Sequence, residues 1–319
     1  MKVENILLAT DFSKQAQEAE VYACLWAESW GAELKVITVL EFDPGLNPEY
    51  SVNQLYLNEL TKQATEALNT VRVRIAERGI PVQTRMARGI PSKEIVAAAE
   101  AENADFIVVG TAGKSGLEHV LLGSTAERVI RSAPCPVLAV PVKRSEGEQS
   151  ERRSARPAIK KLLIPFDFSD CSLDALEYGV VMAGPVQAAV MLLHVLEPVS
   201  YGLDFTLVHS DAKQRREAIE KRLADIASAV NTAGVPCEYS VRGGLPNDSI
   251  LEAAKTLSAD MVVMGTHGRR GLSHALYGSV AEAVLRKSRC PVLMVRSPKF
   301  RPGHRRALSV LSAGEGSEN

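Results

Sequence analysis

The chain contains 319 residues, enough for about two domains, and its 46% hydrophobic and 24% charged residues are typical of soluble globular proteins. The formal net charge of −1 provides no overall field that would attract nucleic acid, and no run approaches the roughly 18 apolar residues of a membrane span. The opening residues lack the layout of a signal peptide, and the five scattered cysteines form no CxxC pair. Nucleic-acid and membrane partners, disulfides and zinc are therefore not expected, and a cytoplasmic location is expected.

Short apolar strands and helices alternate along the first half of the chain. Strands are expected at 5–9, 34–40, 82–87, 105–109 and 136–142. Helices are expected after Ser13, from about 52 to 78, after Ser92, and at 124–131, with the two serines as N-caps. This alternation predicts an α/β fold, with a parallel sheet covered by helices on both faces. Right-handed crossovers then place ligands at the carboxyl ends of the strands.

The second half of the chain repeats the first. Gly79-Ile-Pro recurs as Gly234-Val-Pro, and Cys135-Pro-Val-Leu as Cys290-Pro-Val-Leu, each 155 residues later. A repeat of this length indicates a duplicated domain rather than a solenoid unit. We therefore expect a first domain at 1–142, a polar linker at 143–159, a second domain at 160–296 and a disordered tail at 297–319.

A glycine motif is the strongest chemical signal in each half. The pattern is Gly-x-x-Gly, nine residues, then Gly-Ser, and it directly follows an apolar run. The copies are Gly110, Gly113, Gly123 and Ser124, and Gly265, Gly268, Gly278 and Ser279. A strand followed by a glycine turn and a Gly-Ser helix start is how a backbone cradles phosphate. The alternative is that the glycines only make turns and the serines only cap the helix; two copies with identical spacing favour the phosphate site.

Charged residues flank this motif in both halves. Lys114 and Arg269 follow the second glycine and could reach phosphate oxygens, or could be exposed loop charges. Asp11 and Asp167 follow the first strand of each half, where a carboxylate could accept from an adenine amino group or a ribose hydroxyl, or could cap the next helix. Because valine occupies position 108, the first copy is not a Walker A loop.

Histidines do not form a shared catalytic set. His119 and His274 are paired by the repeat but fall inside the nine-residue loop, and His267 corresponds to Ala112 in the first half. No Ser-His-Asp or Cys-His set can be assembled from paired positions. No catalytic residue is therefore assigned.

With these motifs the chain resembles the universal stress protein family in its tandem form, over nearly all of 1–142 and 160–296. The resemblance implies two doubly wound, Rossmann-like domains, each a five-stranded parallel sheet of order 3-2-1-4-5. It implies ATP as ligand, with adenine near Asp11, Val39, Asp167 and Val195. Ribose and phosphates would be held by Gly110, Gly113, Gly123, Ser124 and Thr125, and by Gly265, Gly268, Gly278, Ser279 and Val280. It also implies that the fifth strands pair, here as an intrachain pseudo-dimer, with a further homodimer left open.

The favoured function is an adenine-nucleotide-binding sensor or signalling module of the stress response, read by an unidentified protein partner. The alternative is a slow ATPase or autophosphorylating phosphotransferase, in which Asp11 or Asp167 would help to hold Mg²⁺. No paired residue stands out as a base or a water-positioning group, so an enzyme is not favoured. A related class of ATP-cleaving synthetases carries a Ser-Gly-Gly-x-Asp-Ser loop after the first strand, which is absent from this chain.

Overall fold

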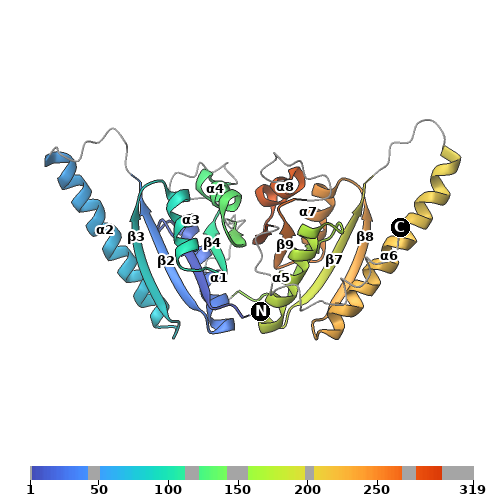
Figure 1. The fold of residues 1–319 in the computed structure, drawn as a ribbon, viewed down its shortest axis with the longest axis horizontal. Coiled ribbons are helices and arrows are strands. Elements are labelled where there is room, and N and C mark those ends of the chain that lie inside the picture. The colour runs from blue at the N-terminus through green and yellow to red at the C-terminus, as the bar shows by residue number, and fades with distance from the viewer. Residues whose placement is uncertain are drawn as a thin grey trace, which may run out of the picture. The chain divides into compact units, whose positions relative to one another are not determined.

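The computed structural model describes residues 2–41, 51–111, 122–141, 157–197, 205–267 and 278–296. The chain divides into two compact units between Pro157 and Ala158. Each unit alternates strands with helices, as Figure 1 shows. Of the predicted linker at 143–159, only 157–159 is described, and the predicted tail at 297–319 lies outside the described residues. None of the described helices has the length and apolarity needed to cross a membrane.

The described residues of the first domain form five parallel strands and four helices. In chain order these are β1 (Asn5–Ala9), α1 (Lys14–Trp30), β2 (Glu33–Leu40), α2 (Ser51–Ala76), β3 (Val82–Arg88), α3 (Pro91–Ala101), β4 (Phe106–Gly110), α4 (Ser124–Ser132) and β5 (Val137–Val140). The strand order β3-β2-β1-β4-β5 confirms the predicted doubly wound sheet.

The second domain repeats this topology. Its elements are β6 (Lys161–Pro165), α5 (Asp170–Val186), β7 (Ala189–Leu196), α6 (Phe205–Thr232), β8 (Cys237–Gly243), α7 (Pro246–Thr256), β9 (Met261–Gly265), α8 (Ser279–Lys287) and β10 (Val292–Val295). The strands are parallel in the order β8-β7-β6-β9-β10. The pairing of the fifth strands across the two domains stays a prediction.

The central strands are apolar because helices cover both of their faces. Ile6, Leu8 and Ile107 are fully buried in the first sheet, and Leu162 and Val263 in the second. In the first domain α1 packs on β1 and β4, α2 packs on β2 and β3, and α3 and α4 contact each other. Parallel strands buried in this way read as near-continuous runs of Val, Ile and Leu, which is why the sequence showed them.

The helix starts confirm one predicted cap and correct another. Ser13 Oγ accepts from the amide of Ala16 at 3.2 Å, so Ser13 is the N-cap of α1, as predicted. The prediction for Ser92 was wrong: α3 begins at Pro91 after Ile90, without a side-chain cap. Proline fixes φ at the first helical position and removes an amide that would have no partner there, so the helix starts two residues earlier than a Ser92 cap implied.

Candidate functional site

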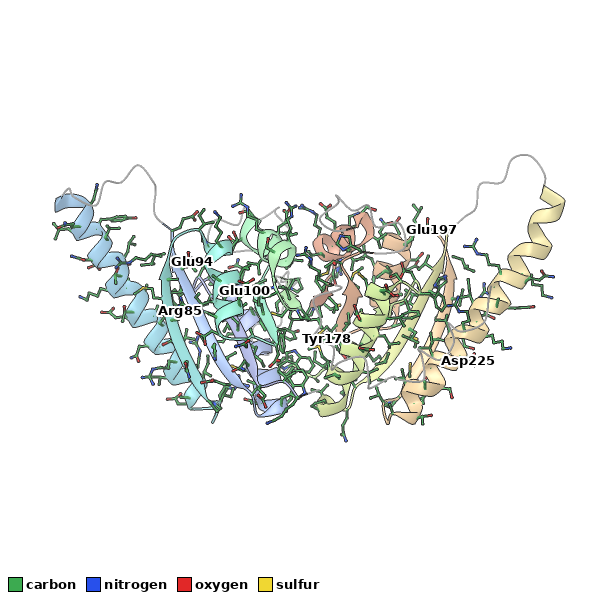
Figure 2. All side chains as sticks on the ribbon, in the orientation of Figure 1. Arg85, Glu94, Glu100, Tyr178, Glu197 and Asp225 are labelled. Atoms are coloured by element: carbon green, nitrogen blue, oxygen red, sulfur yellow. The ribbon has the colours of Figure 1, made fainter. Side chains whose placement is uncertain are left out.

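Of the predicted site residues that the structure describes, those before the glycine-motif loops lie at or directly after the carboxyl ends of the strands in both domains. In the first, the amide of Thr10 donates to the carbonyl of Ile37 at 2.9 Å, which aligns the end of β1 with β2. The amide of Thr111 donates to Val140 O at 2.9 Å, which aligns the ends of β4 and β5. In the second domain, Glu197 directly follows β7 and marks the same edge of the sheet in Figure 2. Each sheet thus carries its candidate residues on one edge.

Asp11 and Asp167 form the turn that leaves the first strand. Asp11 Oδ1 accepts from the amide of Ser13 at 3.0 Å. Asp167 Oδ1 accepts from the amide of Ser169 at 3.0 Å and from its hydroxyl at 2.5 Å. The N-cap residues are Ser13 and Ser169, so the aspartates do not cap the helices directly, but each carboxylate holds the amide of the serine that does. Both carboxylates are half-buried at the edge where the strands end.

A phenylalanine in a left-handed conformation follows each of these aspartates. Phe12 and Phe168 both have φ of 64°. Positive φ is unfavourable for a bulky side chain, and such outliers cluster at sites where the surrounding structure holds them for a purpose. Sequence reasoning missed this feature, because phenylalanine carries no signal for positive φ. In the sequence, only the repeated Asp-Phe-Ser triplet marked these two positions.

Val39 and Val195 lie at the same edge of each sheet as the aspartates. Each is half-buried, one residue before the end of its strand, β2 or β7. The last registered pairs are Ala9 with Ile37 and Pro165 with Leu193, so each valine, and the aspartate of its domain, comes two residues after the last pair. A carboxylate beside an apolar side chain suits a flat, mostly apolar group with a polar rim.

The helix after the glycine motif begins next to the end of the fourth strand. The amide of Gly123 donates to Thr111 O at 2.5 Å, and the amide of Gly278 donates to Thr266 O at 2.8 Å. Each bond joins the two ends of the loop that carries the motif. Because of these bonds, the start of α4 or α8 lies beside the strand end that precedes it.

The N-cap residues of α4 and α8 are Gly123 and Gly278, which have no side chain to form a capping bond. Ser124 and Ser279 occupy the first helical position and are exposed, so the part of the alternative in which the serines cap the helices was wrong. The part in which the glycines only make turns stays open. The first amides of a helix lack partners within it, and here they combine with the positive end of the helix dipole. Thr125 and Val280 follow, half-buried.

The two described motif glycines of the second domain are needed for different reasons. A Cβ at Gly265 would lie 2.7 Å from Cys171 Cβ and 2.9 Å from its backbone carbonyl, so this glycine lets β9 approach the start of α5. Gly278 has φ −70° and ψ 150°, which any residue adopts. Among the described residues, a Cβ there would meet only Thr266 O, at 3.7 Å. Gly265 thus has a packing role that the sequence did not show. At position 278 neither packing against the described residues nor the backbone angles require glycine, so the close approach of a ligand remains as a reason for it there.

Several predicted residues fall outside the described parts of the chain. These are Gly113, Lys114, Gly268 and Arg269, together with His119 and His274. Gly110, like Gly265, ends its strand and is half-buried. His267 lies two residues after the end of β9, and its Nδ1 lies 3.0 Å from Thr266 Oγ1.

Three of the five thiols are unsuited to nucleophilic chemistry. Burial raises the pKa of the Cys24, Cys135 and Cys237 thiols from 9.0 to about 12, so they stay protonated near neutral pH. Within the ranges that the structure covers, no three His, Cys, Asp or Glu side chains group so as to hold a metal.

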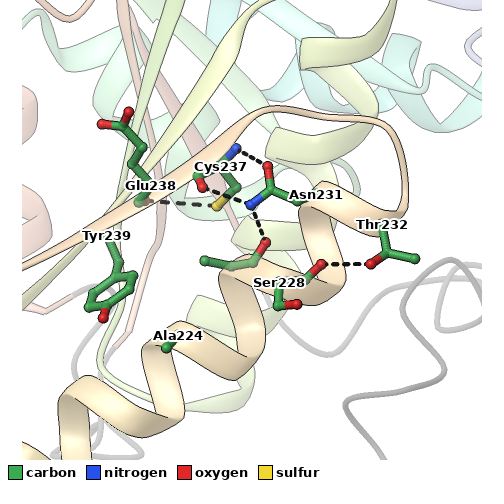
Figure 3. Close-up of a pocket in the computed structure, with 8 residues that line it drawn as sticks. Ala224, Ser228, Asn231, Thr232, Cys237, Glu238 and Tyr239 are labelled. Atoms are coloured by element: carbon green, nitrogen blue, oxygen red, sulfur yellow. Dashed lines mark hydrogen bonds between the residues drawn. The ribbon is translucent and has the colours of Figure 1, made fainter.

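A surface hollow of about 750 Å³ lies away from the strand ends, between α6 and β8 (Figure 3). Asn231 holds its wall together: its amide donates to Ala227 O and Cys237 O, and its carbonyl oxygen accepts from Cys237 N. None of the predicted site residues lines this hollow.

Comparison with known proteins identifies the family. The universal stress protein family profile matches twice, at residues 2–141 and 158–296. A universal stress protein of Methanocaldococcus jannaschii is 43% identical over 139 residues, covering 43% of this chain and 81% of that protein. One from Mycobacterium tuberculosis is 26% identical over 316 residues, covering 92% and 98%. The crystal structure of a universal stress protein from Archaeoglobus fulgidus superposes with a TM-score of 0.69 at 23% identity, covering 92% and 97%. The chain therefore belongs to the universal stress protein family, with two family domains in tandem.

Proposed function

We propose that both domains bind an adenine nucleotide, with ATP and Mg²⁺ as the physiological form, and that the protein is a sensor or signalling module of the stress response. One observation carries the proposal. A helix start with glycine as its N-cap residue and serine as its first helical residue is bonded to the end of the adjacent strand, and the arrangement is built twice, at Gly123 and Gly278.

The helix start supplies what a phosphate needs. Backbone amides without helical partners point along the axis, and the dipole favours negative charge. The exposed hydroxyls of Ser124 and Ser279 can donate to the same oxygens. Gly113, Lys114, Gly268 and Arg269 complete the phosphate side of the proposed sites.

The strand ends supply the adenosine side. Asp11 and Asp167 accept hydrogen bonds from the adenine amino group or a ribose hydroxyl, and Val39 and Val195 pack against the base. Occupancy then stabilises one arrangement of the loops, which a protein partner reads. With two sites in one chain, binding at one domain can change affinity at the other.

The proposal is tested by silencing each helix start separately. Gly123→Val and Gly278→Val place a branched side chain where phosphate would approach, while the backbone angles of both positions suit any residue. Native mass spectrometry at increasing ATP should count two nucleotides on the wild type, one on each variant and none on the double variant. Ser132→Val, an exposed change at the other end of α4, is the control and should keep both.

The outcome that contradicts the proposal is equally specific. If both glycine variants keep two nucleotides while their melting temperatures match the wild type, the helix starts do not hold phosphate. If the wild type carries none at millimolar ATP and Mg²⁺, the nucleotide function itself fails.

A further inference from the structure

A buried histidine lies behind the candidate site of the second domain. His194 is on β7 and is 4% exposed. Its Nδ1 lies 2.7 Å from the carbonyl oxygen of Phe166, the residue before Asp167. A carbonyl oxygen can only accept, so Nδ1 carries the hydrogen and donates. This bond ties the neighbouring strand to the backbone from which the aspartate projects.

Three side chains then hold the residue after the aspartate. The Phe168 ring packs edge-on against Phe166, with centroids 5.0 Å apart, and lies 5.2 Å from the imidazole of His194. The guanidinium of Arg222, on α6, lies 4.2 Å above the same ring. Phe168 is the residue with positive φ, so these contacts offset its unfavourable backbone conformation.

The first domain shapes the same turn with other residues. Thr10 and Thr38 occupy the positions of Phe166 and His194, and Ala67, which carries no charge, occupies that of Arg222. There the amide of Phe12 donates to Thr10 Oγ1 at 3.1 Å, and φ of Phe12 is again 64°. In the first domain the Thr10 hydroxyl thus holds the turn, whereas in the second the bond comes from His194 on the neighbouring strand.

We infer that His194 is a positioning residue for Asp167, which presents its carboxylate to the nucleotide in the second domain; this rests on the proposed function. The Nδ1–H bond fixes the Phe166 peptide, and the ring contact fixes Phe168, so the backbone on both sides of Asp167 is held before a ligand arrives. Preorganisation lowers the ordering cost of binding. The second site therefore binds ATP more tightly than the first, where Thr38 stands in place of the histidine.

The test is a double-mutant cycle in the full chain, with the first site silenced by Gly123→Val. His194→Phe keeps a ring beside Phe168 and removes the donor, whereas His194→Asn keeps an N–H on the γ-carbon. Val190→Ala, a buried change on the same strand away from the turn, is the control for general loss of stability. Affinity for ATP with Mg²⁺ is measured by calorimetry for each, with and without Asp167→Ala.

We expect His194→Phe to weaken ATP binding about fivefold, the worth of one ordinary hydrogen bond, and His194→Asn to stay within about twofold of the wild type. The loss should disappear in the Asp167→Ala background, because the histidine acts through that carboxylate. An equal loss with and without Asp167, or an equal loss in Val190→Ala, would overturn the inference. If no ATP binds before His194 is changed, the proposed function fails instead.

Discussion

The two domains share the turn after the first strand and differ in the interior that supports it. Both place a half-buried aspartate there, then a phenylalanine with φ of 64°, then a serine N-cap. Behind the turn, the first domain has Thr10 and Thr38, whereas the second has Phe166 and His194. The two turns therefore have the same backbone geometry although different side chains hold them in place.

The helices show the same contrast. In the first domain Arg74 binds Glu20 through two bonds of 2.7 and 2.6 Å, joining α2 to α1. In the second, the matching positions are Leu176, which is fully buried, and Ala229. An ion pair in the first domain thus corresponds to two apolar residues in the second, as expected if apolar side chains can replace a buried salt bridge at little cost.

Repetition alone does not identify a functional residue. Asp105 and Asp260 are also paired by the repeat, yet each accepts from two backbone amides at the start of the first strand: Glu4 and Asn5 in one domain, Lys160 and Lys161 in the other. They lie at the amino edge of the sheet and hold it together. Position at the carboxyl edge is what separates the candidate site from such structural pairs.

The largest expected effect is on the stability of the second domain, at Gly265, where the packing leaves no space for a side chain. Gly265→Ala would bring a methyl group within 2.9 Å of the Cys171 backbone, so we expect the second domain to lose roughly 3 kcal/mol of stability. Both tryptophans, Trp26 and Trp30, lie in α1 and report on the first domain. The unfolding midpoint measured by circular dichroism should therefore fall for part of the signal. The midpoint measured by tryptophan fluorescence should stay unchanged.

Gly184→Ala provides the matched control for this experiment. It lies in α5 of the same domain, with nothing within 4 Å of an added Cβ. Because Pro185 follows and disfavours a helical backbone at a residue that carries a Cβ, the gain in helix propensity is offset, and stability should stay within about 1 kcal/mol of the wild type. If both variants behave alike, close packing of β9 on α5 is not what requires glycine at 265.

The next effect is on the ion pair that only the first domain uses. Glu20→Ala leaves Arg74 without its partner, and because the arginine side chain is 46% exposed, we expect a loss of about 2 kcal/mol rather than the full cost of a buried charge. The double variant Glu20→Leu with Arg74→Ala copies the second domain and should come within about 1 kcal/mol of the wild type. Urea unfolding followed by tryptophan fluorescence measures both. A double variant no more stable than the single one would show that the domains' interiors are not interchangeable.

A smaller effect follows from the thiols of the first domain. Burial raises the pKa of Cys24 and Cys135 from 9.0 to about 12, so the folded domain keeps protons that the unfolded chain releases. The stability that the protonated thiols contribute is fully present below pH 9 and is lost as the pH rises toward 12. At about pH 10, each thiol should have lowered the free energy of unfolding by about 1 kcal/mol. Unfolding midpoints from about pH 8 to about pH 10.5 should fall, and fall less in Cys24→Ala. An identical slope in that variant would contradict the cause.

The sequence was sufficient for the topology because the buried parallel strands are continuous apolar runs and the repeat shows each twice. It also located the Gly-Ser helix starts and the aspartates. It could not show the positive φ of Phe12 and Phe168, which tertiary contacts impose on residues with no preference for it. Nor could it show that Gly265 is required by Cys171, since the two are brought together only by the packing of α5 on β9.

The central claim is that two equivalent strand edges each hold one adenine nucleotide, and calorimetric titration of the full chain with ATP and Mg²⁺ tests it most directly. The account predicts two sites per chain, the tighter one weakened by Asp167→Ala and the weaker one by Asp11→Ala. A single site, lost in one aspartate variant and untouched in the other, would contradict the equivalence of the two domains. The absence of any heat of binding at millimolar ATP, confirmed by equilibrium dialysis, would contradict nucleotide binding altogether.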